Sequence, residues 1–265
     1  MRSTFAAASS LCLVLAACGG DTTKTETVMV PARTTDSGEA AAQTPSASGA
    51  GDQPCTRIVI DPGHDARPNP ETEPIGPGSG TRKIKDGGGT RGVATGTPES
   101  VVNMEISLRL RKLLLADGYC VTMTRSRTAG VSIGNIARAR IANRAHAALF
   151  VRIHADGSTD RSRNGTALLY PAYHRGWTDD ILPESKVAAR KLQSALIASL
   201  GSRDLGIVPR LDLTGFNWAN VPAVLPELGF LSNPREDRLL NSARYQQKAA
   251  VGLRNGIHAF APARK

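Results

Sequence analysis

Aromatic residues are scarce in this chain, at 4% of its 265 residues, and the basic residues have no aromatic residues interleaved among them. A stripe of alternating basic and aromatic side chains is typical of proteins that bind nucleic acid. A phosphate-binding loop is also missing, because no Gly-Lys-Thr or Gly-Lys-Ser follows the three glycines at 87–89. We therefore expect neither a nucleic acid partner nor a nucleotide.

The apolar run at residues 5–17 is too short to span a membrane, which takes about 20 residues, but it suits the core of a signal peptide. Its end, Leu-Ala-Ala-Cys-Gly at 15–19, resembles the lipobox of bacterial lipoproteins. The resemblance implies removal of residues 1–17 and lipidation of Cys18. Cleavage after Ala17 without lipidation is the alternative.

Residues 18–54 have almost no aromatic or branched apolar side chains, so they cannot bury enough surface to offset the entropy of ordering. We interpret this segment as a flexible tether that leads to a catalytic domain at 55–262. The formal net charge is +10. For an exported protein this charge favours attraction to anionic wall polymers or lipid headgroups.

Two of the four cysteines, Cys12 and Cys18, lie in the signal segment. The other two, Cys55 and Cys120, each precede a predicted strand in a protein sent to an oxidising compartment, which predicts a disulfide between them. Two buried free thiols are the alternative.

Apolar runs and helical patterns alternate along the remaining chain. Strands are expected at residues 57–61, 121–124, 148–153, 166–170 and 221–225, and helices at 101–116, 133–146, 185–200 and 243–260. This order predicts a single α/β domain, with a mostly parallel twisted sheet, helices on both faces and the site at the C-terminal edge of the strands.

The segment at residues 65–98 is long and rich in Gly and Pro, and it lies between the first strand and the first helix. Most such connections have about 2–6 residues, and longer ones are commonly functional or disordered. We expect the segment to border the site and to act as a mobile flap.

Potential metal ligands stand at three strand ends: His64, His154 and Glu227. Glu99 begins the first helix at the same edge, with Thr97 as its expected cap and Pro98 at the first helical position. Imidazole and carboxylate groups together suit zinc, and a catalytic zinc keeps three protein ligands. For the neighbouring acids Asp61, Asp65 and Asp156 we favour outer roles over direct binding.

Four ordered motifs resemble the zinc-dependent N-acetylmuramoyl-L-alanine amidases. They are Ile-Asp-Pro-Gly-His at 60–64, Glu-Ser-Val-Val-Asn at 99–103, Ile-His-Ala-Asp at 153–156 and Glu-Leu-Gly-Phe-Leu-Ser-Asn at 227–233. The resemblance implies one zinc ion held by His64, Glu99 and His154. It also implies that Glu227 is the catalytic acid or base.

Two further residues are assigned supporting roles. Asn103 lies one turn after Glu99, where it can hold that carboxylate or a substrate group. Arg125 matches a Thr-Arg that follows the second strand in the family, but the Asp often found a few residues later is absent here. That difference leaves a salt bridge of Arg125 in doubt.

The reaction that the resemblance implies is zinc-dependent hydrolysis of the amide bond between N-acetylmuramic acid and L-alanine in peptidoglycan. The expected partners are peptidoglycan or muropeptides, a membrane through the lipid anchor, and a regulatory protein of unknown identity. Other readings are a peptidoglycan carboxypeptidase or deacetylase that uses the same metal, and a non-catalytic wall-binding lipoprotein. The expected location is outside the cytoplasm, anchored to a membrane and facing the wall or periplasm.

Overall fold

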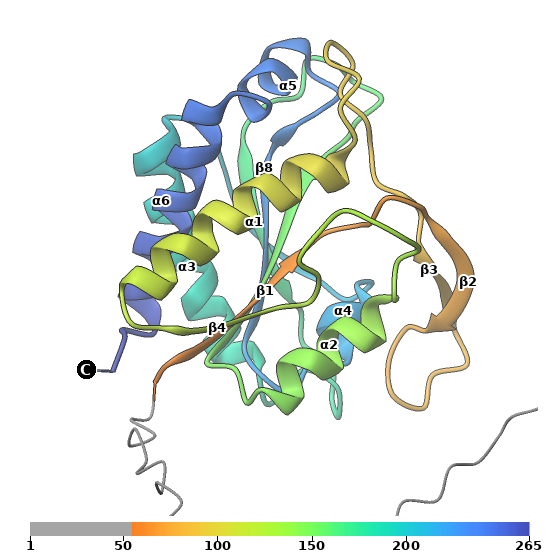
Figure 1. Ribbon diagram of the computed structural model, residues 1–265. Coiled ribbons are helices and arrows are strands. Elements are labelled where there is room, and N and C mark those ends of the chain that lie inside the picture. Colours follow the sequence, from red (N-terminus) through yellow and green to blue (C-terminus); the bar gives the residue numbers. More distant parts are fainter. Residues whose placement is uncertain (1–54, 265) are drawn as a thin grey trace, which may run out of the picture. The chain divides into compact units, whose positions relative to one another are not determined.

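The computed structural model describes residues 55–264, and a twisted six-stranded sheet forms its centre (Figure 1). The strand order is β4-β1-β5-β8-β6-β7. Strands β4, β1, β5 and β8 are parallel, whereas β6 runs antiparallel to β8 and β7 runs parallel to β6. The strands are β1 (Arg57–Pro62), β4 (Cys120–Met123), β5 (Leu149–Asp156), β6 (Thr166–Pro171), β7 (Asp204–Arg210) and β8 (Ala223–Phe230).

Helices cover both faces of this sheet. The larger apolar core lies under the three long helices α1 (Glu99–Ala116), α3 (Leu182–Leu200) and α6 (Ala243–Phe260). A smaller core lies on the other face, under α2 (Asn135–Arg144) and α4 (Thr214–Asn217). The short helix α5 (Pro234–Leu240) follows the end of β8. The prediction of one α/β domain with a mostly parallel sheet is therefore confirmed.

Strands β5 and β8 extend further than the sequence predicts. They continue through His154 and Glu227, so both residues lie within strands rather than after them. The predicted cap of α1 is wrong, because Pro98 occupies the N-cap position, no side chain caps the helix, and Glu99 is its first residue. Pro98 suits this place since it has no N–H to satisfy and favours extended backbone.

The long segment after β1 contains a β-hairpin that the sequence did not predict, formed by β2 (Asn69–Pro74) and β3 (Arg82–Asp86). Glu73 is buried and its carboxylate accepts hydrogen bonds from the backbone N–H groups of Asn135 and Ile136 at the start of α2. The indole N–H groups of Trp218 and Trp177 donate to the carbonyls of Pro74 and Pro77. The hairpin is thus fastened to three other parts of the domain.

The predicted signal, lipobox and tether lie outside the described residues. None of the described helices has the length and apolarity needed to cross a membrane.

A disulfide joins Cys55 to Cys120, as the sequence predicts. It links the chain just before β1 to the first residue of β4, its neighbour in the sheet. The two cysteines are 65 positions apart, so the bond restricts a long loop of the unfolded chain.

We predict that Cys120→Ser lowers the free energy of unfolding by about 2–4 kcal/mol, because the unfolded chain gains the entropy that the bond removes. Urea denaturation with and without reductant measures this change. Reductant should destabilise the original protein and leave the Cys120→Ser variant unaffected. Equal unfolding midpoints for the two proteins under oxidising conditions would contradict the prediction.

Candidate metal centre

His64 follows the end of β1 in a left-handed backbone conformation, with φ of 57°. Its Nδ1 lies 2.6 Å from Oδ1 of Asp86, the last residue of β3. Burial by itself would lower the pKa of His64, but the hydrogen bonds with Asp86 and Glu99 outweigh it and raise the pKa to about 10. Because Asp86 engages Nδ1, the other ring nitrogen is directed toward Glu99, 3.4 Å away.

The loop that carries His64 is held in place by Arg125. The guanidinium donates to the backbone carbonyls of Pro62, Gly63 and Ser100. Arg125 therefore joins the end of β1 to the first turn of α1, and it does so through carbonyl groups rather than through a salt bridge.

Glu99 is buried at the start of α1 and lies between the two histidines. Its carboxylate accepts hydrogen bonds from the backbone N–H of Thr90 at 2.9 Å and from the side chain of Asn103 at 3.1 Å. Burial opposes ionisation of Glu99, but the hydrogen bonds with His154 and His64 outweigh it and lower the pKa. The carboxylate is therefore ionised and oriented before any ligand arrives.

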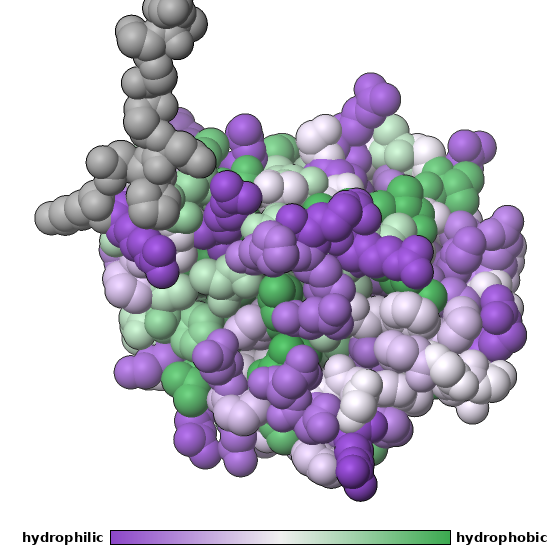
Figure 2. Space-filling model, turned by 90° about the horizontal axis from the view of Figure 1, so that it is seen from below, coloured by the Kyte–Doolittle hydropathy of each residue, from purple (hydrophilic) through white to green (hydrophobic). Residues whose placement is uncertain are grey.

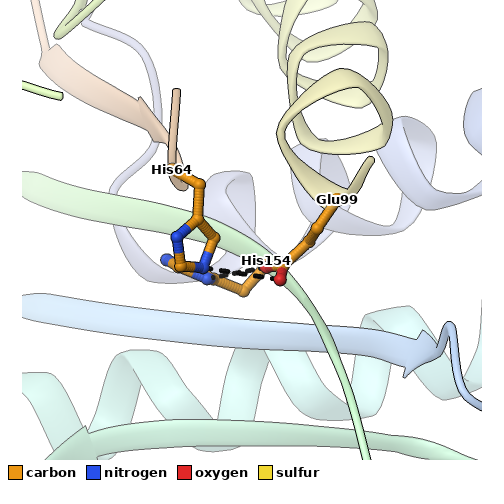
Figure 3. A group of neighbouring side chains, drawn as sticks. All are labelled: His64, Glu99 and His154. Atoms are coloured by element: carbon orange, nitrogen blue, oxygen red, sulfur yellow. Dashed lines mark hydrogen bonds and ion pairs between the residues drawn. The ribbon is translucent and has the colours of Figure 1, made fainter. Parts of the chain in front are cut away.

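His154 points from β5 toward the same place, with Nδ1 at 3.0 Å from Oε1 of Glu99. Figure 3 shows the three side chains converging from the end of β1, the start of α1 and strand β5. One potential ligand atom from each of His64, Glu99 and His154 lies within 4.8 Å of the other two. The structure thus brings together the three residues that the sequence predicted as ligands.

Several observations fit this cluster to a metal ion. Two imidazole nitrogens and one carboxylate oxygen are the donors that a catalytic zinc takes. A Cβ added at Gly89 would lie 2.7 Å from both the Glu99 carboxylate and the His64 ring, and one at Gly63 would overlap the ring of His154. Only glycine lets the backbone approach the donors this closely. His64 also has the carboxylate partner on its second ring nitrogen that metal-bound histidines commonly have.

Glu227 lies on β8 directly opposite His154 on β5. Its Oε2 is buried and has no hydrogen-bond partner among the described residues. Burial, together with the charges of Glu99 and Asp156, raises the pKa of Glu227 well above its usual value. A carboxyl group with a raised pKa beside a cluster of metal donors suits proton transfer near neutral pH.

A cavity of about 300 Å³ connects these residues to solvent. One wall is the end of the hairpin, from Lys83 to Gly87, and the floor is the sheet at His154, Leu225 and Glu227. The segment at 65–98 therefore borders the site, as predicted from the sequence. Its role as a mobile flap stays a prediction.

The acids that the sequence placed near the ligands have other partners. Asp61 is fully buried and pairs with Arg138 at 2.5 Å and Arg152 at 2.9 Å. Burial opposes ionisation of Asp61, but the two guanidinium groups lower the pKa. Asp65 accepts hydrogen bonds from the backbone N–H groups of Ala66 and Ala129, and Asp156 accepts one from Gly157.

Asp86 is the site residue that the sequence did not single out. It belongs to a hairpin strand, Arg-Lys-Ile-Lys-Asp, that lacks the apolar pattern of a buried strand. The available signal was its position, since Asp86 directly precedes three glycines in a loop between two proposed ligands.

Potential metal donors at the C-terminal edge of a parallel sheet, facing an acid with a raised pKa, are an arrangement that suits an α/β hydrolase. The family model for N-acetylmuramoyl-L-alanine amidases, Amidase_3, matches residues 58–259. The chain belongs to this family.

Two relatives and one solved structure named as N-acetylmuramoyl-L-alanine amidases agree with this membership. The amidase Rv3717 of Mycobacterium tuberculosis is 31% identical over 208 residues, which are 77% of this chain and 85% of the relative. The amidase LytC of Bacillus subtilis is 31% identical over 190 residues, which are 72% of this chain but only 35% of LytC. The crystal structure of the amidase Ami1 from Mycobacterium smegmatis superposes with a TM-score of 0.71 at 29% identity, covering 77% of this chain and 96% of Ami1.

We predict that Asp86→Asn weakens zinc binding by about 10- to 100-fold, because the amide no longer fixes which ring nitrogen of His64 carries the proton. Competition with a chromophoric chelator measures the zinc affinity of the folded protein. Asp212→Asn is the matched control, since Asp212 lines the same cavity but pairs with Arg210. Unchanged affinity in Asp86→Asn would show that His64 needs no such partner.

Proposed function

We propose that this protein is a zinc-dependent hydrolase that cuts the amide bond between N-acetylmuramic acid and L-alanine in peptidoglycan. The observation that carries the proposal is the convergence of His64, Glu99 and His154 on one place, with Glu227 opposite them. The family match and the mycobacterial relative support the same reaction.

His64, Glu99 and His154 would hold the metal. Zinc supplies Lewis acidity, which makes water a nucleophile at neutral pH and polarises a carbonyl group. The protein orients its donors in advance through Asp86, Asn103 and the backbone N–H of Thr90. Preorganised donors reduce the reorganisation that binding would otherwise need.

Glu227 would move the proton. As a carboxylate it accepts a proton from the attacking water, and as a carboxylic acid it returns that proton to the departing alanine nitrogen. The raised pKa of Glu227 suits the second half of this cycle, because the carboxyl group keeps its proton to a higher pH than an ordinary glutamate does. Oε2 of Glu227 has no hydrogen-bond partner in the described structure, so no neighbouring group competes for its proton.

We also propose that the protein is exported and attached to a membrane by lipid on Cys18. This proposal rests on the sequence at 15–19, and on a downstream domain that belongs to a family with cell-wall amidases. One or two lipid chains hold a protein at a membrane surface without a spanning helix.

We predict that replacing Glu99 and replacing Glu227 have different effects on zinc content and turnover. Glu99→Ala should lose zinc and activity together, because one of three ligands is gone. Glu227→Gln should keep zinc and the fold but lose about 100- to 10,000-fold in turnover, because an amide cannot accept the proton of the water. Metal analysis, together with mass spectrometry of digested muropeptides, measures both effects.

Glu105→Gln is the matched control, because Glu105 lies exposed on the same helix as Glu99. Free stem peptide and intact glycan are the expected products. Release of a terminal amino acid or of acetate would instead identify a carboxypeptidase or a deacetylase, and zinc binding without any turnover would identify a wall-binding protein. Loss of zinc from Glu227→Gln with retention in Glu99→Ala would reverse the proposed roles.

We predict that Cys18→Ser abolishes labelling by a fatty-acid probe and moves the protein from the membrane fraction to the soluble exported fraction. Lipid attachment requires the thiol, whereas signal cleavage after Ala17 alone does not. Fractionation and immunoblotting measure this change. Membrane retention of the Cys18→Ser variant would contradict the anchor.

A further inference from the structure

A second cavity, of about 590 Å³, lies away from the metal centre, where the end of α3 meets α5 and the start of α6. No residue that lines it also lines the cavity beside Glu227. The lining residues that matter for its chemistry are four cations and one acid: Arg203, Arg235, Arg244, Lys248 and Glu236.

The four cations are exposed, and among the described residues none of their side chains forms a salt bridge or a hydrogen bond. Side chains that do form salt bridges with carboxylates are elsewhere: Lys83, Lys85, Arg138, Arg152, Arg210 and Arg254. Like charges that surround one cavity without counterions raise its electrostatic potential and favour an anionic ligand.

The one acid that lines the cavity offsets only part of the charge of the four cations. Glu236 is buried, and its two carboxylate oxygens accept hydrogen bonds from the backbone N–H groups of Gly165 and Phe230. Burial raises the pKa of Glu236. Glu236 therefore binds backbone N–H groups beneath the cavity, whereas the four cations are exposed to solvent.

The start of α6 adds to the positive potential. Arg244 lies in the first turn of this 18-residue helix, and that turn contains no acidic residue. The positive end of a helix dipole disfavours a cation. Arg244 therefore does not stabilise the start of α6. A bound anion would offset the positive charge of both the helix end and the cations.

Helix α6 shows where the cavity lies relative to the central sheet. The far end of α6 lies beside the start of β1, because Thr56 and Tyr119 donate to the carbonyls of Pro262 and Ala261. The start of α6 is roughly 27 Å away along the helix axis, at 1.5 Å per residue. The cavity therefore lies near the C-terminal edge of the sheet, as the metal centre does, and far from the point where residues 1–54 join the domain (Figure 1).

Figure 2 shows one face of the domain, seen from below, on which hydrophilic residues predominate and hydrophobic residues are scattered among them.

We infer that the cavity formed by Arg203, Arg235, Arg244 and Lys248 is a binding site for an anionic wall polymer whose repeating units carry phosphodiester groups. The site is separate from catalysis, and it would hold the domain on wall material while the metal centre works on peptidoglycan. The part concerning peptidoglycan rests on the proposed function, whereas polymer binding does not.

The test uses the purified zinc-loaded protein with poly(glycerol phosphate) as the probe and isothermal titration calorimetry as the measurement. We predict that the triple variant Arg235→Gln, Arg244→Gln and Lys248→Gln loses at least about tenfold in affinity. We also expect a shallower dependence of the logarithm of affinity on the logarithm of salt concentration, because fewer counterions are released.

The matched control replaces three exposed helical cations outside the cavity, Arg111, Lys112 and Arg190, with Gln. Both variants have the same net charge, so retained affinity in the control assigns binding to the cavity. Equal loss in the two variants would overturn the inference in favour of diffuse attraction. Vesicles with phosphatidylglycerol form a second arm, and binding to these vesicles but not to the polymer would also overturn it.

Turnover of small soluble muropeptides separates this inference from the proposed function. It should be unchanged in both triple variants, because neither alters a residue of the metal centre. A protein that binds the polymer through the cavity but cuts no muropeptide would refute the proposed reaction and leave the binding site standing.

Discussion

The geometry of this domain depends on a buried carboxylate, Asp61, held between the guanidinium groups of Arg138 and Arg152. An unpaired charge at this depth would cost several kcal/mol, so the three residues must be placed together or not at all. They belong to β1, α2 and β5, and Arg138 also donates to the carbonyls of Pro62 and His64. The turn that presents His64 is thus built on this ion cluster.

The same cluster connects the metal centre to the hairpin. Arg152 donates to the side chain of Asn135, and Asn135 in turn donates to the carboxylate of Glu73 on β2. Glu73 accepts the free N–H groups at the start of α2, as a capping residue of the helix itself would do. Asn135 also donates to the backbone carbonyl of Lys85, the residue before Asp86. The ion cluster is therefore connected through Asn135 to the carboxylate beside His64.

The sequence predicted the parallel core and the residues on its edge, because those depend on local patterns. Apolar runs identify β1, β5 and β8, and His64, His154 and Glu227 follow or end such runs. The hairpin was not predicted, since β2 and β3 are mostly polar and β2 contains two prolines. Its position depends on the contact of Glu73 with α2 and on hydrogen bonds from Trp177 and Trp218. Contacts of this kind depend on the tertiary structure and leave no periodic signal.

Two glycines in the candidate metal centre show how a protein can lose activity while it keeps every reactive side chain. Positions 63 and 89 have no room for even a methyl group, because a Cβ would collide with the rings and carboxylate that face the metal. A relative with both histidines and both glutamates but alanine at either position would look like an enzyme and could not assemble the site. To identify inactive members of such a family, the residues at positions 63 and 89 must therefore be compared together with the ligands.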